Sequence, residues 1–123
     1  MMVIYTSYFA QLRKIPDNIM PISICAKAPD WYSGIQYKKL APKYGFLMKY
    51  KQNQDRDAYI NSFQKEILDV LNQDDVVSEL SALSEGKDIV LLCFEKTHDF
   101  CHRHLVANWL NEHLKYRVVE WGA

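Results

Sequence analysis

The run Ile89-Val90-Leu91-Leu92 constrains the fold of this chain more than any other segment. It is continuously apolar, with Gly86-Lys87 before it and polar residues after it. A strand buried on both faces, as in a parallel sheet, has such a sequence, whereas a strand with one solvated face alternates apolar and polar residues. The segment therefore predicts a central strand of a parallel sheet.

Strand and helix patterns alternate along the rest of the chain. Short apolar runs predict strands at residues 3–6, 19–25, 45–50, 88–93 and 116–119. Helices are predicted, mostly from apolar residues spaced three and four apart, over residues 7–15, 59–71, 76–83 and 105–114. Residues 26–42 predict an ordered loop with a short helix. This alternation is typical of an α/β fold, and we expect a compact three-layer sandwich with a mainly parallel sheet flanked by helices.

The composition limits the class of protein. A chain of 123 residues with 49% hydrophobic residues is typical of one globular domain, and we expect one α/β domain over residues 1–123. Fifteen basic and fifteen acidic residues exclude a generally polybasic nucleic-acid binder but allow a local basic patch. No apolar stretch reaches the roughly 20 residues that span a bilayer. With three cysteines and no signal-peptide pattern, we expect a cytoplasmic protein with reduced thiols and no membrane partner.

Ionisable groups concentrate in residues 93–104, CFEKTHDFCHRH, directly after the predicted central strand. Open α/β sheets bind ligands beyond the carboxyl ends of their strands, so this segment lies where the architecture places a site. Asp99 is a candidate N-cap, which would put Cys101 and His102 in the first turn of the last helix. Free amides and the helix dipole at that position favour a thiolate or a bound anion.

These residue types favour an enzyme with a reactive thiol beside an anion site. Cys101 is the candidate nucleophile and Cys93 a second thiol. His102 or Glu95 would serve as the general acid–base, and Arg103 would hold the anion. The expected substrate is a phosphate-bearing small molecule, a nucleotide or a nucleic-acid end. This interpretation needs no cofactor and no metal, and it leaves oligomeric state and a nucleic-acid partner open.

Three alternatives use the same residues. Thiol and imidazole groups could form a structural zinc site, although the spacing lacks a CxxC pair, from Cys93, His98, Cys101 and either His102 or His104. Cys93 and Cys101 could instead form a redox disulfide, again without a CxxC motif. A non-catalytic binding module would use Arg103, Lys27 and the first helical turn to hold a phosphate, with the cysteines only packing.

The segment 86–95, GKDIVLLCFE, followed by Cys101-His102-Arg103, resembles a known family. It is similar to the domain of unknown function 488 family, whose members end a strand in LLC-x-E and resume with CHR at a helix start. The helix 59–71 and the opening strand also fit the family layout. The resemblance implies a compact three-layer α/β fold in bacterial, archaeal or phage cytoplasm. It also implies one shared site, formed by Cys93, Glu95, Cys101, His102 and Arg103.

The chain departs from the family pattern after the second strand. Many members have Asp-x-Arg and a proline there, whereas residues 22–29, ISICAKAP, keep only the proline. Lys27 would then supply the positive charge of the missing arginine. Trp31 would lie over the same end of the sheet and stack on a planar ligand such as a base, or it would pack the loop down.

Overall fold

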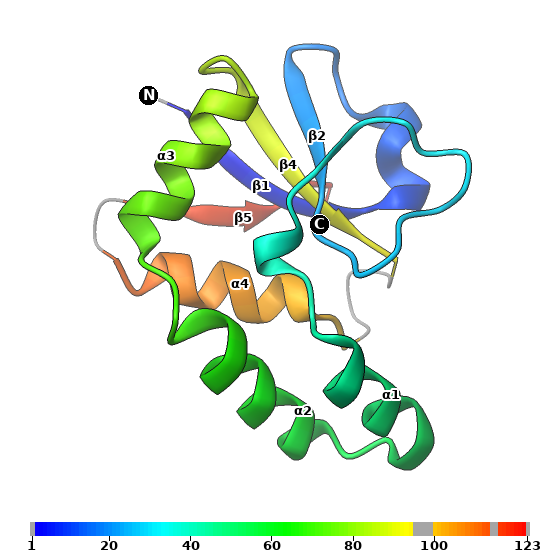
Figure 1. Cartoon of the computed structure of the whole chain (residues 1–123). Coiled ribbons are helices and arrows are strands. Elements are labelled where there is room, and N and C mark those ends of the chain that lie inside the picture. The colour runs from blue at the N-terminus through cyan, green and yellow to red at the C-terminus, as the bar shows by residue number, and fades with distance from the viewer. Residues whose placement is uncertain (1, 95–99, 114–115, 123) are drawn as a thin grey trace.

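The fold is taken from a computed structural model of the chain, in which residues 2–94, 100–113 and 116–122 are described (Figure 1). In these ranges a five-stranded sheet has the order β3-β2-β4-β1-β5, and every strand pair is parallel. The strands are β1 (Ile4–Tyr8), β2 (Ile19–Ser23), β3 (Ile35–Gln36), β4 (Asp88–Cys93) and β5 (Val118–Glu120). The predicted parallel sheet is confirmed.

Strand β4 lies at the centre of this sheet and is buried on both faces. Ile89 and Leu91 belong to the larger apolar cluster of the protein, while Val90 and Leu92 belong to a second cluster with Phe9. Successive side chains of a strand point to opposite faces, so the two clusters lie on the two sides of the sheet. The uninterrupted apolar sequence of β4 follows from this double burial, as predicted.

Helices form the outer two layers. The larger cluster contains residues from α1 (Tyr44–Asn53), α2 (Arg56–Phe63), α3 (Gln73–Leu83), α4 (His102–Asn111) and η3 (Gln64–Leu68), a π-helical turn that continues α2. The other face is covered by the 3-10 helix η1 (Phe9–Lys14) and the loop that contains Tyr32. A short 3-10 turn, η2 (Lys38–Leu40), precedes α1. The predicted three-layer α/β sandwich is therefore confirmed.

Among the helices of the described ranges, none combines the length and the apolar character needed to cross a membrane.

The strand predicted at residues 45–50 is wrong, because this segment forms most of helix α1. Phe46 is buried and packs edge-on against Tyr59 and Phe63 of α2, with ring centroids 5.3 and 6.4 Å apart. Tyr50, four residues later, also contacts the ring of Tyr59 at 5.2 Å. Residues four apart lie on the same face of a helix, so Phe46 and Tyr50 pack against α2 together. Short apolar runs do not distinguish these two structures by periodicity.

Three smaller differences bear on the site. Strand β1 continues to Tyr8, so the predicted helix over 7–15 is shortened to a 3-10 helix that begins at Phe9. Strand β2 ends at Ser23 and leaves Cys25 beyond it. Strand β5 extends to Glu120, one residue past the predicted end, and pairs this residue with Thr6 of β1.

We expect Leu80→Ala to lower the free energy of unfolding by about 2–5 kcal/mol, because it opens a cavity under α3. Leu83→Ala is the matched control on the same helix, since Leu80 is 0% exposed and Leu83 is 42% exposed. The control should cost less than about 1 kcal/mol. Urea unfolding of both variants checks the packing, and equal losses would contradict it.

Candidate functional site

The candidate site lies where β4 ends and α4 begins. Cys93 is the last residue of β4, and Cys101 directly precedes α4. Their sulfurs are joined in a disulfide, and both side chains are buried. The sequence analysis gave a disulfide between Cys93 and Cys101 as one of several alternatives for this segment. Glu95, His98 and Asp99, which the sequence singled out, lie outside the described residues.

Helix α4 starts two residues later than an N-cap at Asp99 predicts. Its first residue is His102, and Cys101 occupies the N-cap position with extended backbone angles, φ −151° and ψ 144°. Cys101 is thus not inside the first turn as the sequence suggested. It still adjoins the helix N-terminus, where unpaired amides favour negative charge.

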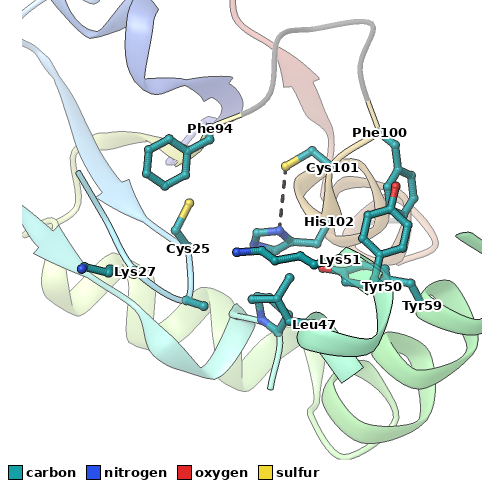
Figure 2. Close-up of a pocket in the computed structure, with 12 residues that line it drawn as sticks. Cys25, Lys27, Leu47, Tyr50, Lys51, Tyr59, Phe94, Phe100, Cys101 and His102 are labelled. Carbon is teal, nitrogen blue, oxygen red and sulfur yellow. Dashed lines mark hydrogen bonds between the residues drawn. The ribbon is translucent and has the colours of Figure 1, made fainter. Parts of the chain in front are cut away.

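His102 has a defined tautomer. Its Nε2 lies 2.6 Å from the carbonyl oxygen of Ile24, which can only accept, so Nε2 carries the hydrogen. Nδ1 lies 3.8 Å from the sulfur of Cys101 (Figure 2). Burial lowers the pKa of His102 to about 4; the Ile24 hydrogen bond opposes this shift, and the positive charge of Arg103 adds to it. The ring is therefore neutral near neutral pH and presents an acceptor lone pair to Cys101.

Arg103 points away from the pocket into the protein. Its side chain is 0% exposed and forms a two-point ion pair with Glu120 of β5, Nη2–Oε2 at 2.8 Å and Nε–Oε1 at 3.2 Å. Its Nη1 donates to the sulfur of Cys93 at 3.2 Å. Arg103 is buried against Glu120 and is not part of the pocket lining described below, so its role as an anion-binding residue stays a prediction.

Glu120 stays ionised beside this guanidinium. Burial on its own would raise the pKa of Glu120, but hydrogen bonds from Arg103 and Thr6 and the charge of Arg103 outweigh it, and the pKa is lowered. The Thr6 hydroxyl donates to Glu120 Oε1 at 2.6 Å. Neighbouring residues of β1, β5 and α4 therefore form one buried polar network behind Cys93.

A pocket of about 270 Å³ opens beside Cys101 and His102 (Figure 2). Two exposed lysines, Lys27 and Lys51, contribute to its lining, together with the buried thiol of Cys25. The remaining lining is largely apolar and consists of Ala26, Pro42, Leu47, Tyr50, Tyr59, Phe94 and Phe100. In Figure 2 the Lys51 amine reaches toward the space between Cys25 and His102. The pocket therefore combines two sulfurs, an imidazole and two amines with aromatic walls.

The structure brings together some of the predicted site residues and separates others. Cys101, His102 and Lys27 line the pocket, whereas Cys93 lies behind Cys101 beside Arg103. Trp31 does not line the pocket. It is 63% exposed and contacts Phe9 edge-on at 6.1 Å, so a stacking role there is not supported by its position.

The sequence analysis did not identify three residues of this region, Cys25, Lys51 and Glu120. Cys25 follows β2 at the same sheet edge as Cys93, and that placement was a usable signal. Lys51 comes from α1, which was predicted as a strand, so its approach to the pocket was not foreseeable. Glu120 reaches Arg103 only through the pairing of β5 with β1.

Cys93, Cys101 and His102 form the cluster of possible metal ligands in the described part of the chain, with ligand atoms within 4.8 Å of one another. Thiolates and imidazole are zinc ligands, and a carbonyl on the second ring nitrogen is a common supporting contact. The disulfide removes both thiolates, so these residues could bind zinc only in the reduced protein.

The lowered pKa of His102 predicts a loss of stability on acidification. The unfolded chain takes up the proton near pH 6.5 and the folded protein only near pH 4, so stability falls across this window as pH decreases. We expect a loss on the order of 3 kcal/mol. Urea unfolding at each pH should show that His102→Gln removes this dependence. His113→Gln, a control at a surface histidine, should keep it; an unchanged profile in His102→Gln would contradict the burial of a neutral ring.

Removing one partner of the Arg103–Glu120 pair should be costly. Glu120→Gln leaves the fully buried guanidinium without its carboxylate, and we expect a loss of about 3–5 kcal/mol. Glu66→Gln, which removes the partner of Lys43 in an exposed pair at 3.9 Å, should cost less than about 1 kcal/mol. Denaturant midpoints of the two variants measure this difference, and similar midpoints would rule out a buried pair.

The comparisons with known proteins identify the family of the chain. Residues 9–114 match a family model described as DUF488-N3a, active DUF488-N3 subclade. Neither the comparison with curated proteins nor that with solved structures gave a match. The matched range includes β2, β3, β4 and α4, and with them Cys93, Cys101, His102 and Arg103. The chain belongs to the domain of unknown function 488 family.

Proposed function

We propose that this protein is a thiol enzyme that acts on an anionic, phosphate-bearing substrate, with Cys101 as its nucleophile. One observation carries the proposal: the sulfur of Cys101 lies 3.8 Å from the acceptor nitrogen of a neutral, buried His102. The two groups line a pocket that also contains Lys27 and Lys51. A thiol beside a base is the arrangement that nucleophilic catalysis needs.

The reaction would begin from reduced Cys101. Its thiol gives a proton to His102 Nδ1, and the sulfur attacks the electrophilic centre of the substrate. A bond from sulfur to that centre forms, the bond to the leaving group breaks, and the leaving group takes the proton from His102. Because burial holds the pKa of His102 near 4, its protonated form is a strong acid for this last transfer. Lys27 and Lys51 would hold the phosphate.

Cys93 would serve as the second thiol, and the disulfide as a reversible oxidised state. A dithiol reductant would approach Cys101 through the pocket that this residue lines. A thiolate of the reductant attacks the sulfur of Cys101 and the S–S bond breaks. Cys93 leaves as a thiolate beside the Arg103 guanidinium. The reductant's second thiolate then releases Cys101. A neighbouring cation stabilises a thiolate and makes it a better leaving group.

Two further points support an enzyme over a binding module. The matched family model is described as active. A module that only holds a phosphate would need the lysines of the pocket but not an acceptor nitrogen beside Cys101. Glu95 lies outside the described residues, and its role as a proton carrier stays a prediction.

The test is the pH dependence of alkylation in the reduced protein. With Cys93→Ser to prevent the disulfide, Cys101 should react with iodoacetamide as a thiolate well below the ordinary thiol pKa of about 8.5. Adding inorganic phosphate should slow the reaction, and Lys51→Gln should shift its midpoint upward, because a neighbouring positive charge favours the thiolate. Peptide mass spectrometry assigns the modified cysteine, with Cys25→Ser as a control that leaves the Cys101 profile unchanged.

Other outcomes would redirect the interpretation. If Cys101 titrates near about 8.5 or is inaccessible, the nucleophile assignment is wrong. Protection by phosphate with an ordinary titration would favour the binding module. Stoichiometric zinc in reduced protein purified without chelators, lost in Cys101→Ser, would instead favour a metal site.

A further inference from the structure

The basic residues of this chain are unevenly distributed. Residues 26–51 contain six lysines and a single acidic residue, Asp30, although the whole chain has no net charge. The lysines lie in the loop after β2, in η2 and along α1. A neutral protein with one strongly positive segment has a local electrostatic footprint that its total charge hides.

Five of these lysines line one groove of about 760 Å³, formed between this segment and η3. They are Lys27, Lys38, Lys39, Lys43 and Lys51. Glu66 is the acidic residue of the lining, and the remainder is mostly apolar, including Leu47, Met48, Val70 and Leu71. The groove is thus a positive rim over an apolar floor.

The groove adjoins the pocket of Cys101 and His102. Both cavities share five lining residues, Ala26, Lys27, Pro42, Leu47 and Lys51. A ligand that lies along the groove therefore passes beside the pocket.

The five lysines are exposed, although the Lys38 amine also donates to the carbonyl oxygens of Cys25 and Ala26. Lys39 pairs with Glu79 at 2.8 Å and Lys43 with Glu66 at 3.9 Å, both on the surface, where such pairs contribute little. Among the described residues, no carboxylate lies within ion-pair distance of Lys27 or Lys51. Phosphates of a ligand can replace the weak pairs and neutralise the unpaired amines.

Exposed aromatic rings accompany the charges. Tyr44 in the groove is 76% exposed, and Phe94 in the pocket is 52% exposed. Bases stack on such rings when they are unpaired, and stacking combined with a positive groove is the usual way in which proteins bind single strands. A duplex would hide its bases from both rings.

We propose that this groove binds single-stranded nucleic acid, with the phosphates along the lysines and an end nucleotide in the thiol pocket. The groove binding stands on the charges and rings above, and only the placement of the end rests on the proposed function. A single phosphate would engage one or two amines, whereas five amines along one continuous groove fit a chain of phosphates.

The test is fluorescence anisotropy with a labelled oligonucleotide of roughly 12 nucleotides, a length within single-strand site sizes. Binding should weaken from about 50 to 200 mM salt, with a logarithmic slope of about −0.7 for each phosphate held and a limit of about −3.5 for five lysines. The double variant Lys39→Gln, Lys43→Gln should reduce the slope by about 1.4. These two lysines line the groove but not the pocket.

The matched control is Lys49→Gln with Lys87→Gln, which removes two exposed lysines outside the groove and should leave the slope unchanged. Equal losses in both double variants, no saturable binding, or tighter binding to duplex or to anionic lipid vesicles would overturn the proposal. The titration uses the oxidised protein, in which the Cys93–Cys101 disulfide blocks the thiol chemistry, so a failure of that chemistry leaves this result unaffected.

Discussion

The buried charge of Arg103 sets the arrangement of the whole site. A guanidinium with no exposed surface is tolerated only when a carboxylate and further acceptors surround it, and here Glu120 and the sulfur of Cys93 do so. These partners come from β5 and β4, while Thr6 of β1 holds Glu120 in place. The start of α4 is thereby tied to three neighbouring strands, and its first residues have little freedom.

Because the start of α4 is held in this way, the consecutive residues 101–103 have different partners. Arg103 is directed toward β5, and His102 is directed toward the Ile24 carbonyl after β2. Cys101, at the N-cap, is left between Cys93 and the pocket. The three side chains of the motif Cys-His-Arg therefore contact different parts of the fold. Its arginine fixes the helix and the second sulfur, its histidine faces the thiol, and only the first two residues reach the pocket.

The sequence predicted the parts of the fold that follow from local patterns and missed those that follow from distant pairing. The apolar run 89–92 and the spacing of Phe63 and Ile67 were sufficient for the central strand and for the helix after α1. Residues 45–50 misled because Phe46 and Tyr50 pack on a neighbouring helix, which periodicity over six residues does not reveal. The family resemblance drew attention to Cys101, His102 and Arg103 but not to the orientation of their side chains. That Arg103 is buried depends on Glu120, 17 residues away and on an edge strand.

The distribution of charge explains how a neutral chain can present a positive site. The arginine that sequence reasoning assigned to a ligand is neutralised inside the protein, so it contributes little field at the surface. The lysines of residues 26–51 remain exposed around the groove and the pocket, with few acids nearby. A ligand can bind exposed lysine amines directly, whereas the buried guanidinium of Arg103 is already bound to Glu120. Arg103 thus stabilises the structure around the site, and the lysines are exposed where a ligand would bind.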